Sequence, residues 1–475
     1  MRVRGLTDGR RRRFGLHVAV ATGLAVALVP FVSSAGPAAA RVVGPLPNGA
    51  ITHVMVIDLE NEAAADTFGS AANEPYLVNT LEPLGTLVAN YFAIGHVSLD
   101  NYIAQVSGQA PNALTSSDCL SSAGARFQDM GPGTLDPKQT KYPGQVDGIG
   151  CVMPPRVQNI GNQLDATYPK TKSSNWREYG EDMGNDPARD HGVPDPLGGT
   201  DCAHPVQANG NATDPTESAE GPNGSGSQRS TISDQYVDRH NPFIYFHSVI
   251  DNPATCHRDV VPLGTVTVGQ NGAPNRFKGH LAKDLAKAST TPRFSFVSPN
   301  VCDDGHDGTC AGHNTDGTTA GGFAGINAWL MHWMPLILSS PAYRSGKMLV
   351  VITADEGSLA DSAAGDHEQP GPNDPNPGSS PLLHPGQPEP PAGTAPGGGR
   401  IGALVLNPIW VHPGTVDTRG SYNHYSALRT FEDLLGITEG GADGKGHLGF
   451  ASTAHDFGSD LFRPVPAKVP DLLPR

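Results

Sequence analysis

The sequence predicts an α/β fold in which a mostly parallel central sheet carries helices on both faces. The runs Val54–Leu59, Phe294–Ser298 and Met348–Thr353 are apolar without alternation, which is typical of strands buried on both sides. Segments with apolar residues at helical spacing lie between such runs. Alternation of buried strands with helices is the pattern of layered α/β proteins.

Two further apolar runs complete the predicted sheet, and three segments are predicted to be helical. The additional strands are Phe243–His247 and Ile401–Leu406. The helices are Pro75–Leu84, Phe323–Leu338 and Ser426–Leu435, the last of which opens on a serine cap. Gly- and Pro-rich segments at 187–226 and 357–399 are predicted to be long surface loops or insertions.

The amino-terminal stretch has the three parts of an export signal. A basic block at Arg10–Arg13 precedes the apolar stretch Leu16–Val32, and small residues end at Ala40. The consecutive arginines favour the twin-arginine route, and an uncleaved anchor is the alternative. We expect residues 1–40 to be removed and residues 41–475 to form a secreted domain. No other stretch approaches about 20 apolar residues, so stable membrane insertion is not expected.

The composition limits the partners of the chain. Its formal net charge is −15 at pH 7. An acidic surface repels nucleic acid and anionic membranes, so we expect no nucleic-acid partner. Binding of an anionic substrate needs a local positive centre, for which a metal ion is the natural candidate because no other basic cluster is found.

Six cysteines are expected to form disulfides, as is typical of an exported protein. They follow no CxxC zinc pattern, and six cysteines allow fifteen pairings. Cys302 and Cys310 flank a short polar loop that a disulfide between them would staple.

Ligand-type side chains follow the predicted strands. They are Glu60-Asn61, Asp251-Asn252, Asn300 with Asp303–Asp307, Asp355-Glu356 and, after a loop, Asn423-His424. In open α/β sheets ligands bind beyond the carboxyl ends of the strands. One acidic residue after a strand is often only a helix cap, and a single histidine is often structural. Five such strand ends favour a ligand site over five separate turns.

The segment Gly95–Tyr102 contains a candidate nucleophile. Ser98 lies just before a predicted helix that runs to about Ser107. A side chain there faces free backbone N–H groups and the positive end of the helix dipole, which suits an oxygen nucleophile that attacks phosphorus. Asn101 is placed to donate a hydrogen bond to a phosphoryl oxygen. The alternative is that Ser98 only caps the helix.

Together these segments resemble the bacterial phosphoesterase family that includes secreted acid phosphatases and non-haemolytic phospholipases C, within the alkaline-phosphatase-like superfamily. His53–Gly69 is similar to the opening motif, Gly95–Gly108 to the nucleophile segment and Gly420–Ile437 to the carboxy-terminal signature. Asn241–Pro262, Phe294–Cys310 and Met348–Gly357 follow in the order of the family. The resemblance implies an alkaline-phosphatase-like fold.

The resemblance also implies roles for individual residues. Ser98 would be the nucleophile that forms a phosphoserine, with Asn101 as an oxyanion donor. The implied metal ligands are Glu60, Asn61, Asp355 and Glu356, with Asp304 as a companion. His306 and His424 would bind a second metal or contact phosphate and move protons. One or two divalent ions are expected: oxygen ligands favour Ca, Mg or Mn, and the histidines suit Zn or Fe.

Two positions depart from the family pattern. The opening motif usually continues Glu-Asn-Arg, but Glu62 stands where the basic residue is common. Asp100 stands where proline is common in the nucleophile segment. The first departure removes a positive charge that is often near the phosphate.

The predicted function is a metal-dependent, acid-phosphatase-like phosphomonoesterase that acts on a phosphorylated small molecule or a lipid head group. A phospholipase C-type phosphodiesterase is the first alternative, and an inactive secreted binding protein of the same fold is the second. A metal-free serine esterase is disfavoured, because Gly-His-Val-Ser-Leu does not fit the G-x-S-x-G elbow.

Overall fold

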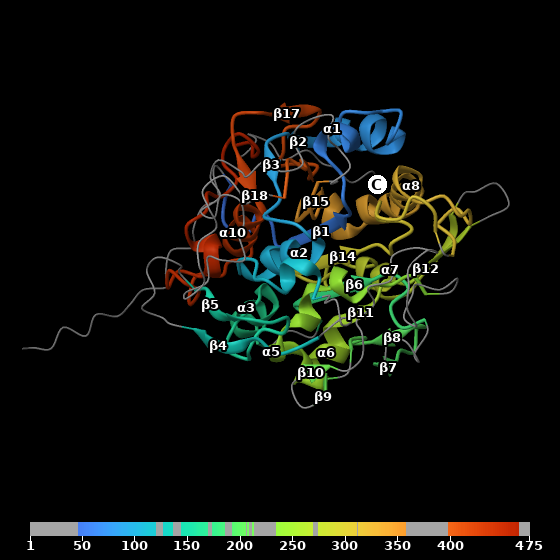
Figure 1. The fold of residues 1–475 in the computed structure, drawn as a ribbon. Helices are drawn as coiled ribbons and strands as arrows, with labels where there is room; N and C mark the ends of the chain where they lie inside the picture. The colour runs from blue at the N-terminus through green and yellow to red at the C-terminus, as the bar shows by residue number, and fades with distance from the viewer. Residues whose placement is uncertain are drawn as a thin grey trace, which may run out of the picture. The chain divides into compact units, whose positions relative to one another are not determined.

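The central feature of the protein is an eight-stranded sheet, seen in a computed structural model (Figure 1). The structure describes residues 46–119, 127–135, 144–169, 173–185, 192–205, 207–208, 211–212, 234–268, 274–310, 312–357 and 398–464. The predicted export signal, nearly all of the predicted loop 357–399 and much of the predicted loop 187–226 lie outside these residues. All described elements belong to one unit that begins at Ala40.

The strand order in the sheet is β11-β6-β14-β1-β15-β16-β2-β17. The strands are β1 (His53–Leu59), β2 (Gly85–Val88), β6 (Trp176–Gly180), β11 (Val260–Pro262), β14 (Phe294–Ser298), β15 (Met348–Ala354), β16 (Ala403–Leu406) and β17 (Thr415–Asp417). Only β16 runs antiparallel to its neighbours in this sheet, so the prediction of a mostly parallel sheet is confirmed.

Helices and short pairs of strands surround this sheet. The α-helices are α1 (Ala64–Thr67), α2 (Ser98–Ser107), α3 (Ile160–Thr167), α5 (His247–Ile250), α6 (Pro253–Asp259), α7 (His280–Leu285), α8 (Phe323–Ser339), α9 (Pro341–Arg344) and α10 (His424–Leu434). The other turns of helix are η1 (Leu77–Leu81), η2 (Glu82–Leu84), η3 (Thr115–Ser117), η4 (Asp238–His240), η5 (Pro242–Tyr245) and η6 (Gly449–Ser452). The two-stranded sheets pair β3 (Tyr91–Phe92) with β18 (Tyr422–Asn423), β4 (Gly131–Leu135) with β5 (Val146–Ile149), β7 (Val193–Pro194) with β8 (Thr200–Asp201), β9 (Gln207–Ala208) with β10 (Asn211–Ala212), and β12 (Thr265–Val268) with β13 (Pro274–Lys278).

Helices cover both faces of the sheet, as the apolar runs predict. The ring of Phe296 on β14 lies 5.9 Å from that of Tyr102 on α2, and α10 packs against α2 on this side. Its neighbour Val297 points to the other face, in register with Tyr179 of β6. The Tyr179 hydroxyl donates to Asp284 of α7 at 2.8 Å. Both faces are therefore buried, which explains why the strands lack polar alternation.

One predicted strand is wrong. Phe243–His247 forms the turn η5 and the start of α5, with all of Phe243–Phe246 buried. An apolar run of this length fits a buried turn as well as a strand, and Pro242 at the first position of the turn favours the helical geometry. Asp251 therefore does not follow a strand. It is exposed and pairs with His247.

The structure differs in detail from three other predictions. The segment predicted as the helix Pro75–Leu84 contains the short turns η1 and η2. Helix α10 begins two residues earlier than predicted, and its cap is the side chain of Asn423, which accepts from the Ser426 amide at 3.0 Å. Within the predicted loop 187–226, Thr200 is fully buried in β8, so this part is packed.

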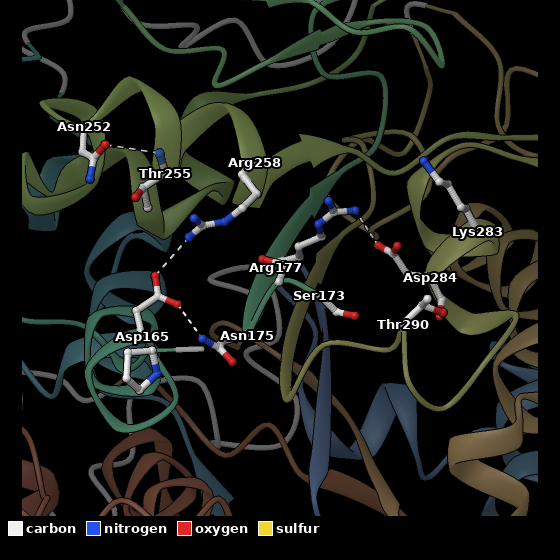
Figure 2. Close-up of a pocket in the computed structure, with 12 residues that line it drawn as sticks. Asp165, Ser173, Asn175, Arg177, Asn252, Thr255, Arg258, Lys283, Asp284 and Thr290 are labelled. Carbon is white, nitrogen blue, oxygen red and sulfur yellow. Dashed lines mark hydrogen bonds and ion pairs between the residues drawn. The ribbon is translucent and has the colours of Figure 1, made fainter. Parts of the chain in front are cut away.

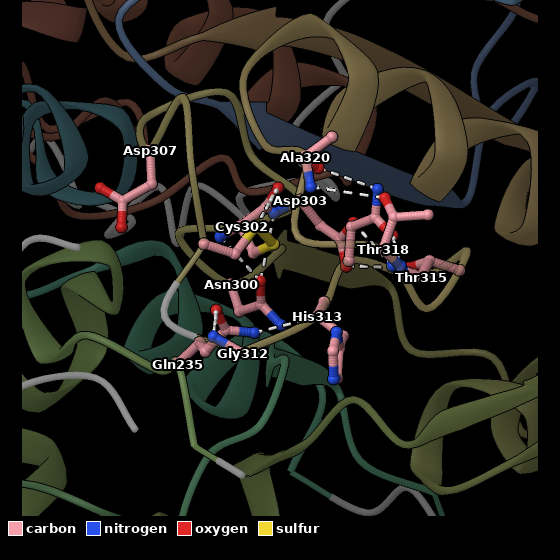
Figure 3. The surroundings of a disulfide bond; sticks show 12 residues. Gln235, Asn300, Cys302, Asp303, Asp307, Gly312, His313, Thr315, Thr318 and Ala320 are labelled. Atoms are coloured by element: carbon pink, nitrogen blue, oxygen red, sulfur yellow. Dashed lines mark hydrogen bonds between the residues drawn. A yellow bond between two sulfur atoms is a disulfide. The ribbon is translucent and has the colours of Figure 1, made fainter. Parts of the chain in front are cut away.

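All six cysteines form disulfides. The pairs are Cys119–Cys151, Cys202–Cys256 and Cys302–Cys310. The predicted staple between Cys302 and Cys310 is confirmed, and Figure 3 shows it beside Asn300 and Asp303. Within the part of the chain described, no helix has the length and apolar character needed to span a bilayer.

Candidate active site

Three neighbouring strands bring the predicted acidic residues together. Strand β1 lies between β14 and β15 and runs parallel to both, so their carboxyl ends share one edge. The Glu60 amide, after β1, donates to the Asp304 carbonyl, after β14, at 2.9 Å. The Asn61 amide donates to Asp355 Oδ1, after β15, at 3.1 Å. The structure thus assembles four of the predicted metal-site residues at this edge.

Ser98 lies at the same edge, as the first residue of α2. Its hydroxyl donates to Glu60 Oε2 at 3.0 Å, and its side chain is buried with 2% exposure. Helix α2 is held against β1 because the Gln105 side chain donates to Asp58 Oδ2 at 2.6 Å. The predicted nucleophile therefore touches a predicted metal ligand directly.

His240 of η4 lies between two of the carboxylates, although the sequence analysis did not select it. Its Nε2 lies 3.1 Å from Glu60 Oε1, and its Nδ1 lies 3.2 Å from Asp304 Oδ2. The ring stacks on Tyr102 with a centroid distance of 5.2 Å. Burial, together with nearby Arg239, keeps the pKa of His240 well below its usual value.

The carboxyl groups at this edge are strongly perturbed by burial. Burial raises the pKa of Glu60 and of Glu356 well above the usual range, and the negative charge of Asp355 adds to both shifts. Burial raises the pKa of Asp355 itself to about 6, although the Asn61 amide opposes the shift. Glu356 also forms an ion pair with His96. This concentration of buried acidic groups creates a demand for positive charge.

The donor set fits a divalent cation. Glu60 Oε1 and Asp355 Oδ2 are buried and neither accepts a well-aligned hydrogen bond. His240 lies close to Glu60 and Asp304, but neither of its ring nitrogens forms a well-aligned hydrogen bond with them. A cation bound by carboxylate and amide oxygens would satisfy these atoms, and such ligands suit hard ions such as Mg²⁺, Mn²⁺ or Ca²⁺.

Two predicted catalytic residues are occupied by structural hydrogen bonds. Asn101 Oδ1 accepts from the Ile94 and Gly95 amides at 2.8 and 3.1 Å, and its Nδ2 donates to the Gly95 carbonyl at 2.9 Å. In His424, Nε2 lies 2.7 Å from the Asp355 carbonyl oxygen and Nδ1 lies 3.2 Å from the Tyr91 hydroxyl. Asn101 therefore holds the loop before Ser98, and His424 holds the backbone of Asp355, a predicted metal ligand.

His306 remains the predicted histidine that is best placed to move protons. Its side chain is 14% exposed, and its Nδ1 lies 3.0 Å from Asp307 Oδ1. Its amide donates to Asp304 Oδ1 at 2.8 Å, and its ring centroid lies 6.1 Å from that of His240. The disulfide Cys302–Cys310 closes the loop that carries both His306 and Asp304.

Two residues of the site that the sequence analysis does not identify, Arg239 and His240, have a common explanation. His240 and Arg239 lie just before the apolar run that is predicted to be a strand. The pattern predicts ligands only after the end of a strand, which in this segment is at Asp251. The signal was present in the sequence as Asp238-Arg239-His240-Asn241, a dense polar group next to a buried segment. His96 was part of the nucleophile segment but had no assigned role.

A second cluster of ionisable groups lies away from Ser98. Asp195, Asp201 and His280 offer ligand atoms within 4.8 Å of one another, the one such group found among the described residues. Arg177 Nη1 donates to His280 Nδ1 at 2.9 Å, so the ring proton is on Nε2, which donates to Asp195 Oδ2 at 2.9 Å. Neither ring nitrogen has a free lone pair, so the group is a hydrogen-bonded network.

This network predicts a pH-dependent effect on stability. Burial and neighbouring Asp195 raise the pKa of Asp201 from 3.8 to about 7. Between about pH 4 and about pH 7 the carboxyl group of Asp201 is protonated in the folded protein and ionised in the unfolded chain. The free energy of unfolding therefore falls as the pH rises through this range. Asp201→Asn keeps a donor but cannot ionise. We expect the difference in melting temperature between Asp201→Asn and wild type to change by about 2–4 °C in favour of the variant when the pH is raised from about 5 to about 8.

Thermal melts of both proteins at the two pH values check this prediction. The matched control is Asp147→Asn, at a partly exposed aspartate in β5. A difference between variant and wild type that does not change with pH would contradict the raised pKa of Asp201.

A cavity of about 630 Å³ lies at the opposite edge of the sheet (Figure 2). Asn175, which directly precedes β6, lines it together with Arg177, Arg258 and Lys283. Arg177 pairs with Asp284 at 2.6 Å and Arg258 pairs with Asp165 at 3.1 Å, so two of its three basic groups are neutralised. Asn252, one of the ligand-type residues that the sequence analysis expects after a strand, lines this cavity, but none of the predicted catalytic or metal-binding residues does. The predicted catalytic and metal-binding residues that the structure brings together lie at the carboxyl edge of the sheet instead.

Comparison with known proteins identifies relatives of this chain. The profile of the Phosphoesterase family matches residues 70–438, which is more than half of the chain. A phosphate-repressible acid phosphatase of Penicillium chrysogenum is 25% identical over 275 residues, covering 58% of this chain and 41% of that protein. The match therefore spans less than half the length of that relative.

Two solved structures match this chain at low sequence identity. A protein in the alkaline phosphatase superfamily from Vibrio parahaemolyticus has 12% identity and a TM-score of 0.39, covering 84% of this chain and 69% of that chain. A lipoteichoic acid synthase from Listeria monocytogenes has 8% identity and a TM-score of 0.35, covering 84% of this chain and 74% of that chain.

Proposed function

The chain belongs to the Phosphoesterase family, and we propose that it is a hydrolase of phosphoester bonds, namely a metal-dependent phosphomonoesterase with Ser98 as its nucleophile. The observation that carries this proposal is the 3.0 Å hydrogen bond from the Ser98 hydroxyl to Glu60 Oε2. This bond places an oxygen nucleophile at a cluster of buried carboxylates. The acid phosphatase relative supports action on monoesters.

Glu60, Asn61, Asp355 and Glu356 are the residues that would hold the metal ion, with Asp304 beside them. When bound, a divalent ion would supply positive charge for the phosphate and lower the pKa of a coordinated hydroxyl. The oxygen-rich donor set favours Mg, Mn or Ca, and we propose no second ion at His424 because both of its ring nitrogens are engaged.

The side chains of the protein account for the other parts of the reaction. Glu60 receives the hydroxyl proton as Ser98 Oγ bonds to phosphorus and the bond to the leaving alcohol breaks. Water then hydrolyses the phosphoserine, and Glu60 returns the proton to Ser98 Oγ as its bond to phosphorus breaks. His306 protonates the leaving alcohol in the first step and accepts a proton from water in the second, because its partly exposed side chain can exchange protons with solvent. Asn101 and His424 position the loop of Ser98 and the backbone of Asp355.

We also propose that the protein is exported. Its three disulfides are typical of proteins that fold in an oxidising compartment. The amino-terminal basic block and apolar stretch agree with this destination.

The test is hydrolysis of p-nitrophenyl phosphate before and after chelation. We expect activity that a chelator removes and that added Mg²⁺, Mn²⁺ or Ca²⁺ restores. Activity that survives complete removal of metal would overturn the metal dependence. A rate on p-nitrophenyl phosphorylcholine that exceeds the rate on the monoester would assign the protein as a phosphodiesterase instead.

A further inference from the structure

The amino end of α2 is only partly available to a phosphate. The Leu99 amide donates to Asp118 Oδ1 at 2.9 Å, so a carboxylate already uses one of the free donors of the first turn. The charge of Asp118 also opposes the positive end of the helix dipole. A phosphoryl group beside Ser98 therefore needs a positive side chain from another element.

Arg239 of η4 brings positive charge to this place. Its Nε lies 3.5 Å from Asp118 Oδ2, and its Nη2 lies 3.4 Å from His306 Nε2. The positive charge of Arg239 acts on Glu60 and on Asp304, where it opposes the rise in pKa that burial causes. Arg239 is therefore within electrostatic reach of the proposed metal site and in contact with the proposed proton-transfer group.

We propose that Arg239 binds the phosphoryl oxygens of the substrate and that the carboxylate of Asp118 competes with them for its guanidinium group. This inference rests on the proposed function. The opening motif has Glu62 where a basic residue is common, and η4 replaces that missing charge from a distant part of the chain. A guanidinium group presents several N–H donors in a fork that matches phosphate oxygens. Arg239 and Ser98 are both buried, with 1% and 2% exposure. Asp118 links them, because it accepts from the amide of Leu99, which directly follows Ser98, and contacts Arg239.

Calorimetric titration of the full, metal-loaded protein with inorganic phosphate tests this assignment. We expect Arg239→Gln to weaken phosphate binding by about 10- to 100-fold, the effect of losing charge-assisted hydrogen bonds. Arg239→Lys should weaken it less, because lysine keeps the charge but not the fork. Arg258→Gln is the matched control, since Arg258 lines the cavity at the opposite edge of the sheet.

Asp118→Asn is expected to change phosphate affinity in the direction opposite to the Arg239 variants. Asparagine keeps an acceptor for the Leu99 amide and tolerates the left-handed backbone at this position, where φ is 49°. It removes the negative charge that competes with phosphate for Arg239. We therefore expect phosphate to bind several-fold more tightly, whereas a purely structural role of the Asp118–Arg239 pair predicts that both variants bind more weakly.

Other results of these titrations would overturn or uphold the role of Arg239. Unchanged phosphate affinity in both Arg239 variants would overturn the proposal, as would a loss of binding in Arg258→Gln, which would place the phosphate in the other cavity. If Arg239→Gln does not fold, the opposite signs expected for Arg239→Lys and Asp118→Asn decide the question. Phosphate binding that depends on Arg239 in a protein that hydrolyses no ester would uphold this inference and overturn the proposed function alone.

Discussion

Ser98→Ala is expected to reduce hydrolysis of p-nitrophenyl phosphate by at least about 10³-fold, as is found when a nucleophile is removed from an enzyme. The variant loses the oxygen that attacks phosphorus and the donor to Glu60 Oε2. It keeps helix α2, because the hydrogen bonds of Leu99 and Gln105 that hold this helix do not involve the serine side chain.

Steady-state kinetics, with metal content and thermal melting as checks, measure this effect. Ser117→Ala is the matched control, since Ser117 is exposed on the nearby turn η3. We expect the control to keep wild-type activity and Ser98→Ala to keep its metal. If Ser98→Ala retains most of the wild-type activity, the nucleophile is another group.

Asp355→Asn is expected to lower both metal content and activity. The amide oxygen still accepts from the Asn61 amide, so the local backbone is kept, but the charge that attracts the cation is lost. Loss of an outer-shell partner of a metal site costs about 10- to 100-fold in affinity or activity, and we expect the loss of a direct ligand to exceed this range.

Elemental analysis after dialysis and assays over a range of metal concentrations check the prediction. Activity should recover in part at high metal concentration, because the remaining ligands are intact. Asp251→Asn serves as the control carboxylate, since Asp251 is 60% exposed and pairs with His247 on the surface. Full activity and unchanged metal content in Asp355→Asn would show that Asp355 is not a ligand.

The central strands and the helix of the nucleophile were predictable because their signals are local. Strand β14 has the bounds that its apolar run predicts, and β15 differs by one residue. The carboxyl ends of neighbouring parallel strands lie at the same edge of a sheet. Once the strands were recognised, the sequence therefore also predicted that Glu60, Asp304 and Asp355 lie close together. The local loop between Cys302 and Cys310 was predictable for the same reason.

The sequence by itself therefore determined the layered fold, the acidic strand ends and the placement of Ser98 at the start of a helix. Only the tertiary structure decided how the polar side chains pair. It placed His240 between two carboxylates and Arg239 beside Asp118, and it engaged both ring nitrogens of His424. The reason is physical: apolar periodicity encodes which backbone is buried, whereas a hydrogen bond between distant segments depends on packing that no local pattern records.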